Sequence, residues 1–73
     1  HMLVVKNDDR PGVIGTVGTL LGTAGVNIAD MDVGSAPNTG TAVMLIATTS
    51  PVPEVVLSDL RTSPGIISVR LTG

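Results

Sequence analysis

Apolar residues in this chain recur with the period of a β-strand in some segments and of an α-helix in others, and turn residues mark each change. Short aliphatic or alternating runs indicate strands, whereas apolar residues spaced by three and four indicate helices. The segments predicted in this way are strands at 3–5, 26–33, 41–48 and 66–71 and helices at 13–24 and 54–61. The predicted element order is therefore β-α-β-β-α-β.

This order is that of the ferredoxin-like α+β fold, also called the split βαβ arrangement. Both β-α-β crossovers are expected to be right-handed, which brings the two helices onto one face of a four-stranded antiparallel sheet. The other face of the sheet and one of its edges then remain open to another subunit.

Polar and turn residues predict where the helices begin and end. Asp9 is a candidate N-cap of the first helix, Pro11 suits its first turn, and Gly25 is a natural stop. In the second helix, Glu54 in the first turn and Arg61 in the last turn complement the helix dipole.

Alternation along the predicted strands is imperfect at one place. In the strand at 26–33 the apolar residues change from even to odd positions: they are Val26, Ile28, Met31 and Val33. We therefore expect a bulge or kink near Ala29, followed by a turn-rich segment at 34–40 that leads into a hairpin. In the final strand, the residues expected on one face are Ile67, Val69 and Leu71.

Three glycines interrupt the first predicted helix at spacings of three and four, namely Gly15, Gly18 and Gly22. Each costs a helix about 0.5–1 kcal/mol relative to alanine. They indicate either a close approach by a partner or by the sheet, or a weak helix that tertiary packing holds in place.

A core built from 73 residues is marginal by itself, because a short chain buries only about 60% of its unfolded surface. Domains of this size usually gain stability from disulfides, a metal or a partner subunit. The chain has no cysteine, and its one histidine is His1, which we interpret together with Met2 as a cloning remnant. Residues 3–73 are therefore expected to form one domain that associates at least as a dimer.

Composition argues against several classes of partner. The chain has no aromatic side chain on which bases stack, and its net charge is −2, so neither nucleic acid nor an anionic membrane is an expected partner. The longest apolar run, at 42–47, falls far short of the roughly 18 residues of a membrane span. We expect a cytoplasmic location, which the absence of cysteine fits.

The chain offers few groups for catalysis. Without cysteine or an internal histidine no Ser–His or Cys–His pair can form, and we predict no catalytic residue, metal site or cofactor. Asp30 and Asp32 share a strand face and would hold a cation weakly, but a solvated strand face is the simpler interpretation. The glycine-rich segment 12–25 lacks the spacing of the phosphate-binding loops, and its glycines lie within the predicted helix.

The loop at 7–12 is the best candidate for a binding site. It leads to a helix N-terminus, where unpaired backbone N–H groups and the positive end of the dipole favour an anion such as a carboxylate. Asn7 and Asp9 add side-chain oxygens that suit an ammonium group. Such a site fits the zwitterion of an α-amino acid, although ordinary capping and turn chemistry would explain the same residues.

Two motifs at this spacing resemble a known family. The segments Asp9-Arg10-Pro11-Gly12-Val13 and Gly25-Val26-Asn27-Ile28 are similar to those of ACT domains, and Ser63-Pro64-Gly65-Ile66 resembles the start of the family's closing strand. The resemblance covers residues 3–71 and is strongest to the ACT domains that follow the catalytic part of D-3-phosphoglycerate dehydrogenases. It implies the βαββαβ fold, side-by-side pairing into an eight-stranded sheet, and a regulatory domain rather than an enzyme.

The resemblance also implies a ligand and its contacts. L-serine, as the feedback inhibitor of a parent dehydrogenase, would bind between two paired domains. The residues that match the family's ligand-binding positions are Asn7, Asp9, Arg10, Pro11, Gly12 and Val13 of one subunit and Asn27 of the other. Asn7 stands where serine-inhibited enzymes often have histidine, and Asp9 stands where many have asparagine. A carboxylate at position 9 would oppose the carboxylate of the ligand, or hold its ammonium group, or cap the helix.

Two alternatives to an amino-acid sensor remain open at this point. One is an assembly domain that pairs but binds no ligand, because positions 7 and 9 have changed. The other is a small acylphosphatase-like hydrolase of the same topology, for which Arg10 and Asn27 are superficially suitable, although the phosphate loop of those enzymes is missing.

Overall fold

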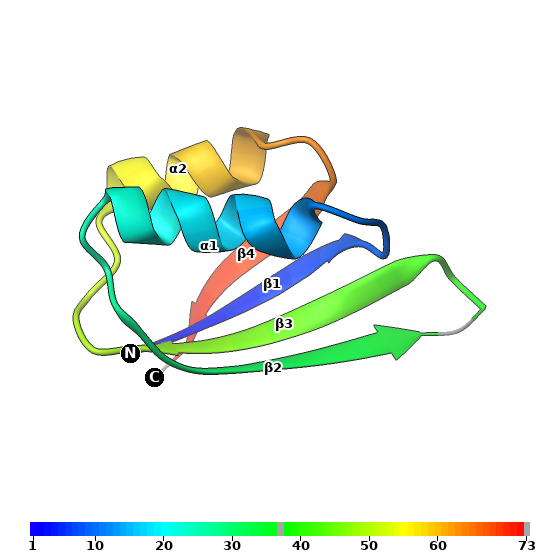
Figure 1. The fold of residues 1–73 in the computed structure, drawn as a ribbon, viewed down its shortest axis with the longest axis horizontal. Coiled ribbons are helices and arrows are strands. Elements are labelled where there is room, and N and C mark those ends of the chain that lie inside the picture. Colours follow the sequence, from blue (N-terminus) through cyan, green and yellow to red (C-terminus); the bar gives the residue numbers. More distant parts are fainter. Residues whose placement is uncertain (37, 73) are drawn as a thin grey trace.

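The computed structural model describes residues 1–36 and 38–72, and these form one sheet covered on one face by two helices (Figure 1). The strands are β1 (Met2–Asp8), β2 (Ile28–Ala36), β3 (Thr41–Thr48) and β4 (Ile66–Thr72). The helices are α1 (Val13–Thr23) and α2 (Glu54–Thr62). The order β-α-β-β-α-β confirms the ferredoxin-like α+β prediction.

The four strands are antiparallel and lie in the order β2-β3-β1-β4. The central strands β1 and β3 pair from Met2↔Ala47 to Asp8↔Thr41, so the end of β1 lies beside the start of β3. The outer strands β2 and β4 form the two edges. Both β1 and β2 continue three residues beyond the predicted ends, because pairing with β3 satisfies backbone groups that their turn residues would otherwise leave unpaired. Pro37, within the predicted loop, lies outside the described residues.

The core lies between the helices and the covered face of the sheet. Leu3 and Val5 of β1 and Met44 and Ile46 of β3 are fully buried there. The helices contribute Val13, Val17 and Leu21 of α1 and Val56, Leu57 and Leu60 of α2, whereas Leu20 is partly buried and Ala24, expected on the same face of α1, is exposed. Burying a side chain of this size contributes about 1.5–3 kcal/mol, so this single layer supplies most of the favourable energy.

The start of α1 differs from the prediction. The N-cap is Gly12, whose φ of 90° lies in the left-handed region, and no side chain caps the helix there. Asp9 is therefore not the N-cap, and Pro11 precedes the helix instead of lying in its first turn. The reason is the loop's own pairing, which keeps residues 8–10 bonded to neighbouring turns and delays the helix.

The end of α1 agrees with the prediction that Gly25 stops the helix. Gly25 has a φ of 76°. Its N–H donates to the carbonyl of Gly22 at 3.0 Å, and the N–H of Val26 donates to the carbonyl of Leu21 at 2.9 Å. These two bonds form a Schellman motif, which satisfies the last helical carbonyls.

Two irregularities shape the outer strands. The register of β2 against β3 shifts between Ile28 and Asp30, which confirms the bulge predicted near Ala29. In β4 the register shifts opposite Lys6/Asn7, and Ile66 packs against the core while Ile67 is 51% exposed. The prediction that Ile67 shares one face with Val69 and Leu71 did not include this irregularity.

The glycines of α1 do not approach the sheet. An ideal Cβ built on Gly15, Gly18 or Gly22 would meet no atom within 4 Å. A close approach by the sheet is therefore excluded, and packing of the opposite, apolar face holds the helix in place.

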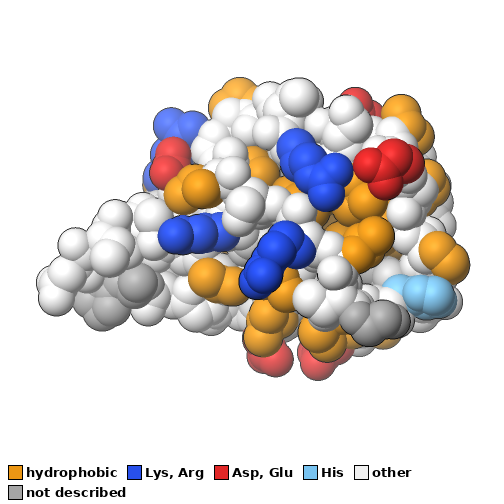
Figure 2. All heavy atoms as spheres, turned by 180° about the vertical axis from the view of Figure 1, so that it is seen from behind, with side chains coloured by type: hydrophobic (Ala, Val, Ile, Leu, Met, Phe, Trp, Pro, Cys, Tyr) orange, Lys and Arg blue, Asp and Glu red, His pale blue; other side chains and the backbone are white. Residues whose placement is uncertain are grey.

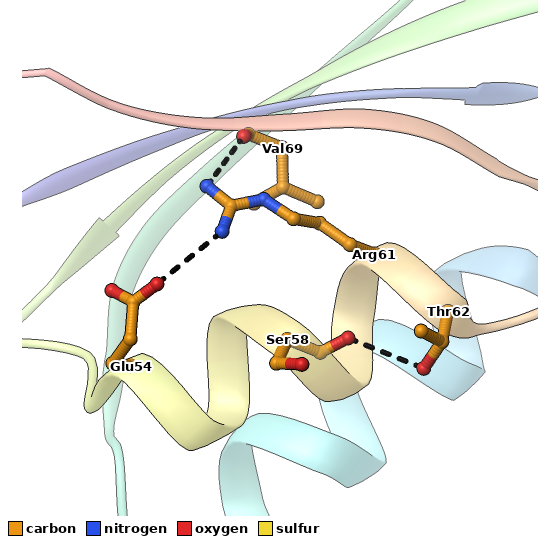
Figure 3. A network of polar contacts seen from close by, with 5 residues as sticks. All are labelled: Glu54, Ser58, Arg61, Thr62 and Val69. Atoms are coloured by element: carbon orange, nitrogen blue, oxygen red, sulfur yellow. Dashed lines mark hydrogen bonds and ion pairs between the residues drawn. The ribbon is translucent and has the colours of Figure 1, made fainter.

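The second helix is tied to the edge strand β4 by an arginine. Arg61 Nη2 donates to the carbonyl of Val69 at 3.2 Å, and Arg61 Nη1 lies 3.5 Å from Glu54 Oε1 (Figure 3). The hydroxyl of Thr62 donates to the carbonyl of Ser58 at 3.2 Å one turn earlier. Arg61 thus links α2 to a backbone acceptor of an edge strand.

Candidate functional site

The loop between β1 and α1 is held by its backbone on both sides. The N–H of Asp8 donates to the carbonyl of Gly65 at 2.7 Å, and the N–H of Asp9 donates to that of Gly40 at 2.8 Å. Gly65 lies in the turn before β4, and Gly40 lies in the turn before β3. The candidate loop is therefore clamped between two other turns at one end of the sheet.

Asn7 is the buried polar residue at this end. Its residue surface is 2% exposed, and its Nδ2 donates to the carbonyl of Asp8 at 2.8 Å. Its Oδ1 is buried and has no hydrogen-bond partner among the described residues. Leaving such an acceptor unpaired costs about 1–3 kcal/mol, so a donor from a water or a ligand would stabilise this end of the sheet.

The N-cap of α1, Gly12, lies five residues after Asn7. The N–H of Thr16 is the first to bond back to the helix, at 3.0 Å from the carbonyl of Gly12, so the N–H groups before it have no intrahelical partner. Since no side chain caps them, these donors and the dipole favour an anion. The hydroxyl of Thr16 also donates to the carbonyl of Gly12 at 3.0 Å, which fixes the first turn.

Arg10 lies over the turn at Gly65. A Cβ at Gly65 would lie 3.2 Å from Arg10 Nη2 and 2.9 Å from Val13 Cγ2, so only glycine leaves room for these two side chains. Arg10 Nε is 4.0 Å from Asp8 Oδ2, and both side chains are about half exposed. Arg10 therefore packs on the turn and partly offsets the charge of Asp8.

Two residues of this region were missed as site residues by sequence reasoning. Gly40 and Gly65 both have positive φ and both accept a hydrogen bond from the candidate loop. A glycine beside a predicted turn was a visible signal, but the sequence does not indicate which loop the turn supports.

Asn27 lies at the other end of the sheet. Its carbonyl accepts the N–H of Thr49 at 3.0 Å, whereas Asn7 pairs with Ala42. The six residue steps of β3 from Ala42 to Thr48 span about 20 Å. One chain therefore brings Asn7, Asp9, Arg10, Pro11, Gly12 and Val13 together, and it does not bring Asn27 to them.

A surface pocket of about 210 Å³ lies near the start of β1, away from the candidate loop. It is lined by His1, Met2, Pro51, Val52, Leu71 and Thr72. None of the predicted site residues lines it, and we assign it no role. Within residues 1–36 and 38–72 there is no group of three or more residues that would hold a metal ion, and no helix long and apolar enough to cross a membrane.

Comparison with known proteins decides the family. The family model of the ACT domain matches residues 1–65. The chain belongs to the ACT domain family. This confirms the resemblance drawn from the Arg-Pro-Gly and Gly-Val-Asn-Ile motifs.

The curated relatives of this ACT domain share one name. It is 41% identical over 66 residues to a D-3-phosphoglycerate dehydrogenase of Synechocystis sp., covering 90% of this chain and 12% of the relative. It is 35% identical to the D-3-phosphoglycerate dehydrogenase of Bacillus subtilis, covering 97% of this chain and 14% of the relative. It is 41% identical to that of Methanocaldococcus jannaschii, covering 96% of this chain and 13% of the relative. The chain thus spans about an eighth of the length of these relatives.

Solved structures confirm the fold. The ACT domain from GTP pyrophosphokinase of Chlorobium tepidum aligns with a TM-score of 0.73 at 12% identity, covering 94% of this chain and 91% of that one. The small subunit of acetolactate synthase from Thermotoga maritima aligns with a TM-score of 0.71 at 19% identity, covering 96% and 45%. At these identities the likeness concerns the fold alone.

Proposed function

We propose that this ACT domain is the regulatory part of a biosynthetic dehydrogenase and binds an amino acid, with L-serine the first choice. One observation carries the proposal: among the described residues, Asn7 Oδ1 is buried without a hydrogen-bond partner, and the loop that follows Asn7 leads to a helix N-terminus without a side-chain cap. A free acceptor and free donors at neighbouring places suit a small molecule that has an ammonium group and a carboxylate.

The orientation of the ligand follows from charge. Its carboxylate would accept from the first N–H groups of α1, where Gly12 and Val13 begin the helix. Its ammonium group would donate to the exposed carboxylate of Asp9, which the structure leaves unused as a cap, and to Asn7 Oδ1 once binding opens access to that buried atom. In this orientation the negative charge of Asp9 attracts the ligand, and the reversed orientation would bring two carboxylates together.

Pairing of two subunits along β2 would complete the site. A two-fold axis makes the two β2 strands antiparallel, so Asn27 of a second copy would come to the end of the sheet that holds Asn7. Arg61 already covers an acceptor of the other edge, β4. Val33 of β2 lies on the helix side and is 45% exposed, so an apolar surface is available for a second copy there.

The regulatory mechanism would be linkage. A ligand that contacts two subunits stabilises their paired state in proportion to its occupancy, and this shifts the equilibrium of the parent enzyme. The relatives named D-3-phosphoglycerate dehydrogenase support such a parent, whose catalytic domains would be the partner of this domain in the cytoplasm.

The test is an NMR amide titration with L-serine, with glycine, L-valine, L-phenylalanine and D-serine in parallel. The chain has no Trp or Tyr, so intrinsic fluorescence is of no use. We expect saturable shifts with L-serine at residues 7–13 and at Asn27, and none with D-serine. Asn7→Ala should abolish them, whereas Asn38→Ala, which removes the same side chain from the β2–β3 turn, should leave them unchanged.

Other outcomes have definite meanings. Saturable shifts with a different amino acid would retain the sensor and change the parent's pathway. If no amino acid shifts the spectrum of a folded dimer, the domain serves assembly only. The hydrolase hypothesis has no support from geometry, because Arg10 and Asn27 lie at opposite ends of the sheet.

A further inference from the structure

The face of the sheet that the helices leave uncovered has an apolar band between an acidic and a basic margin. Asp30 and Asp32 lie on β2 at one edge, whereas Lys6 of β1 and Arg70 of β4 lie toward the other. Figure 2 shows blue basic side chains above an orange apolar band and red acidic side chains along its lower margin. The charge on this face is therefore separated by strand.

The register aligns four of these side chains in one row across the sheet. Asp32 pairs with Leu45, Leu45 with Val4, and Val4 with Arg70. The order along the row is acid, apolar, apolar, base. Leu45 is 42% exposed although it lies in a central strand, and Val4 is partly buried beside it.

The two charged ends of the row have no ion-pair partner among residues 1–36 and 38–72. Both Asp32 and Arg70 are exposed. Among the described residues, the ion pairs join Arg10 to Asp8 and Arg61 to Glu54. Asp32 and Arg70 are thus available to a charged partner.

We propose that this open face packs against the same face of a second copy, with a two-fold axis parallel to the strands. Such an axis reverses the strand order, so β2 of one copy lies over β4 of the other. Asp32 then faces Arg70 at both margins, and Leu45 faces Val4 at the centre. Sheets stacked in this way lie about 10 Å apart with nearly aligned strands, a gap that an arginine and an aspartate bridge together.

The charge pattern selects this arrangement over the other face-to-face dimer. A two-fold axis across the strands would place β2 over β2 and bring the acidic margins together, which disfavours it. The proposal is also independent of the amino-acid site, because the side chain of Asn7 lies on the opposite, helix-covered face of the sheet.

The test is the molar mass of this chain and of two charge-reversal variants by sedimentation equilibrium. Asp32→Lys and Arg70→Glu each place like charges opposite one another, so each should halve the mass of the assembly and weaken association at least about tenfold. A mixture of the two variants should restore the mass. In the mixed dimer, the lysine introduced at position 32 of one copy faces the glutamate introduced at position 70 of the other. At the opposite margin the native pair of Asp32 and Arg70 is kept. Asp59→Lys, an equal charge change on α2, should leave the mass unchanged.

Amide spectra of each variant would show that the fold is retained. If the variants and the original chain have the same mass, this face does not pair with a second copy. If each variant loses association and the mixture does not regain it, Asp32 and Arg70 do not face one another. Either result overturns the proposal and leaves the amino-acid titration unaffected.

Discussion

At the scale of single residues, Asn7 and Gly65 have environments that local sequence patterns do not reveal. Asn7 was predicted as a site residue because it precedes a helix, yet its burial depends on strand pairing with β3 and β4. Gly65 was seen as part of a turn, and the crowding by Val13 and Arg10 is decided by the approach of the start of α1 and the loop before it to the turn before β4.

Replacing Gly65 should therefore destabilise the fold. In Gly65→Ala, the backbone strain of a φ of 86° adds to the steric cost of a Cβ that would lie 2.9 Å from Val13 Cγ2. We therefore expect a loss of about 1–3 kcal/mol in the free energy of unfolding. Urea denaturation followed by circular dichroism measures it. The matched control is Gly22→Ala in α1, which has open space and should gain about 0.5–1 kcal/mol. Equal effects of the two changes would contradict the crowding at Gly65.

Asn7 should show a conflict between stability and binding. Asn7→Leu removes the unpaired buried Oδ1 and places an apolar side chain in the same space, while the carbonyl of Asp8 still accepts the N–H of Arg10. We expect the free energy of unfolding to rise by about 1 kcal/mol and amino-acid binding to disappear. Thermal denaturation and the amide titration measure the two effects. A clear loss of stability would mean that Oδ1 has a partner in the folded protein.

At the scale of elements, the strands and helices follow from hydrophobic periodicity, and their ends follow from contacts. The periods indicated all six elements because a buried face must repeat with the geometry of its own element. The start of α1 and the outer end of β2 shifted because neighbouring turns and strands bond to the loop backbone. Gly25 was correctly predicted as a stop because a left-handed residue is a local requirement.

The link from α2 to β4 gives a prediction at this scale. Arg61→Ala removes the bond to the carbonyl of Val69, and we expect a loss of about 1 kcal/mol together with faster amide exchange along β4. Glu54→Ala should have a much smaller effect, because the Glu54 side chain is 83% exposed and the pair is screened by solvent. If both changes have equal effects, the ion pair rather than the backbone bond ties the helix to the strand.

At the scale of the whole molecule, the amount of core limits the stability of the isolated chain. One layer of side chains lies between the sheet and two helices, and apolar residues remain exposed on the open face and along β2. Covering such surface by association is the means of stabilisation still available to a chain without cysteine.

The melting temperature should accordingly rise with protein concentration, because association favours the folded state by mass action. Calorimetry over a range of concentrations measures this, and added sodium chloride should lower the effect if charged margins contribute to the contact. A melting temperature that is independent of concentration would mean that the folded chain is stable as a monomer.

The sequence by itself determined the order of elements, the fold class, the family and the composition of the loop before α1, since these depend on periodicity and on motifs a few residues long. Tertiary structure alone decided that Asn7 is buried with an unpaired acceptor and that Asn27 lies at the far end. It also decided that Asp32, Leu45, Val4 and Arg70 form one row. Strand order and register set these relations, and both arise from contacts between residues far apart in the chain, which no local pattern encodes.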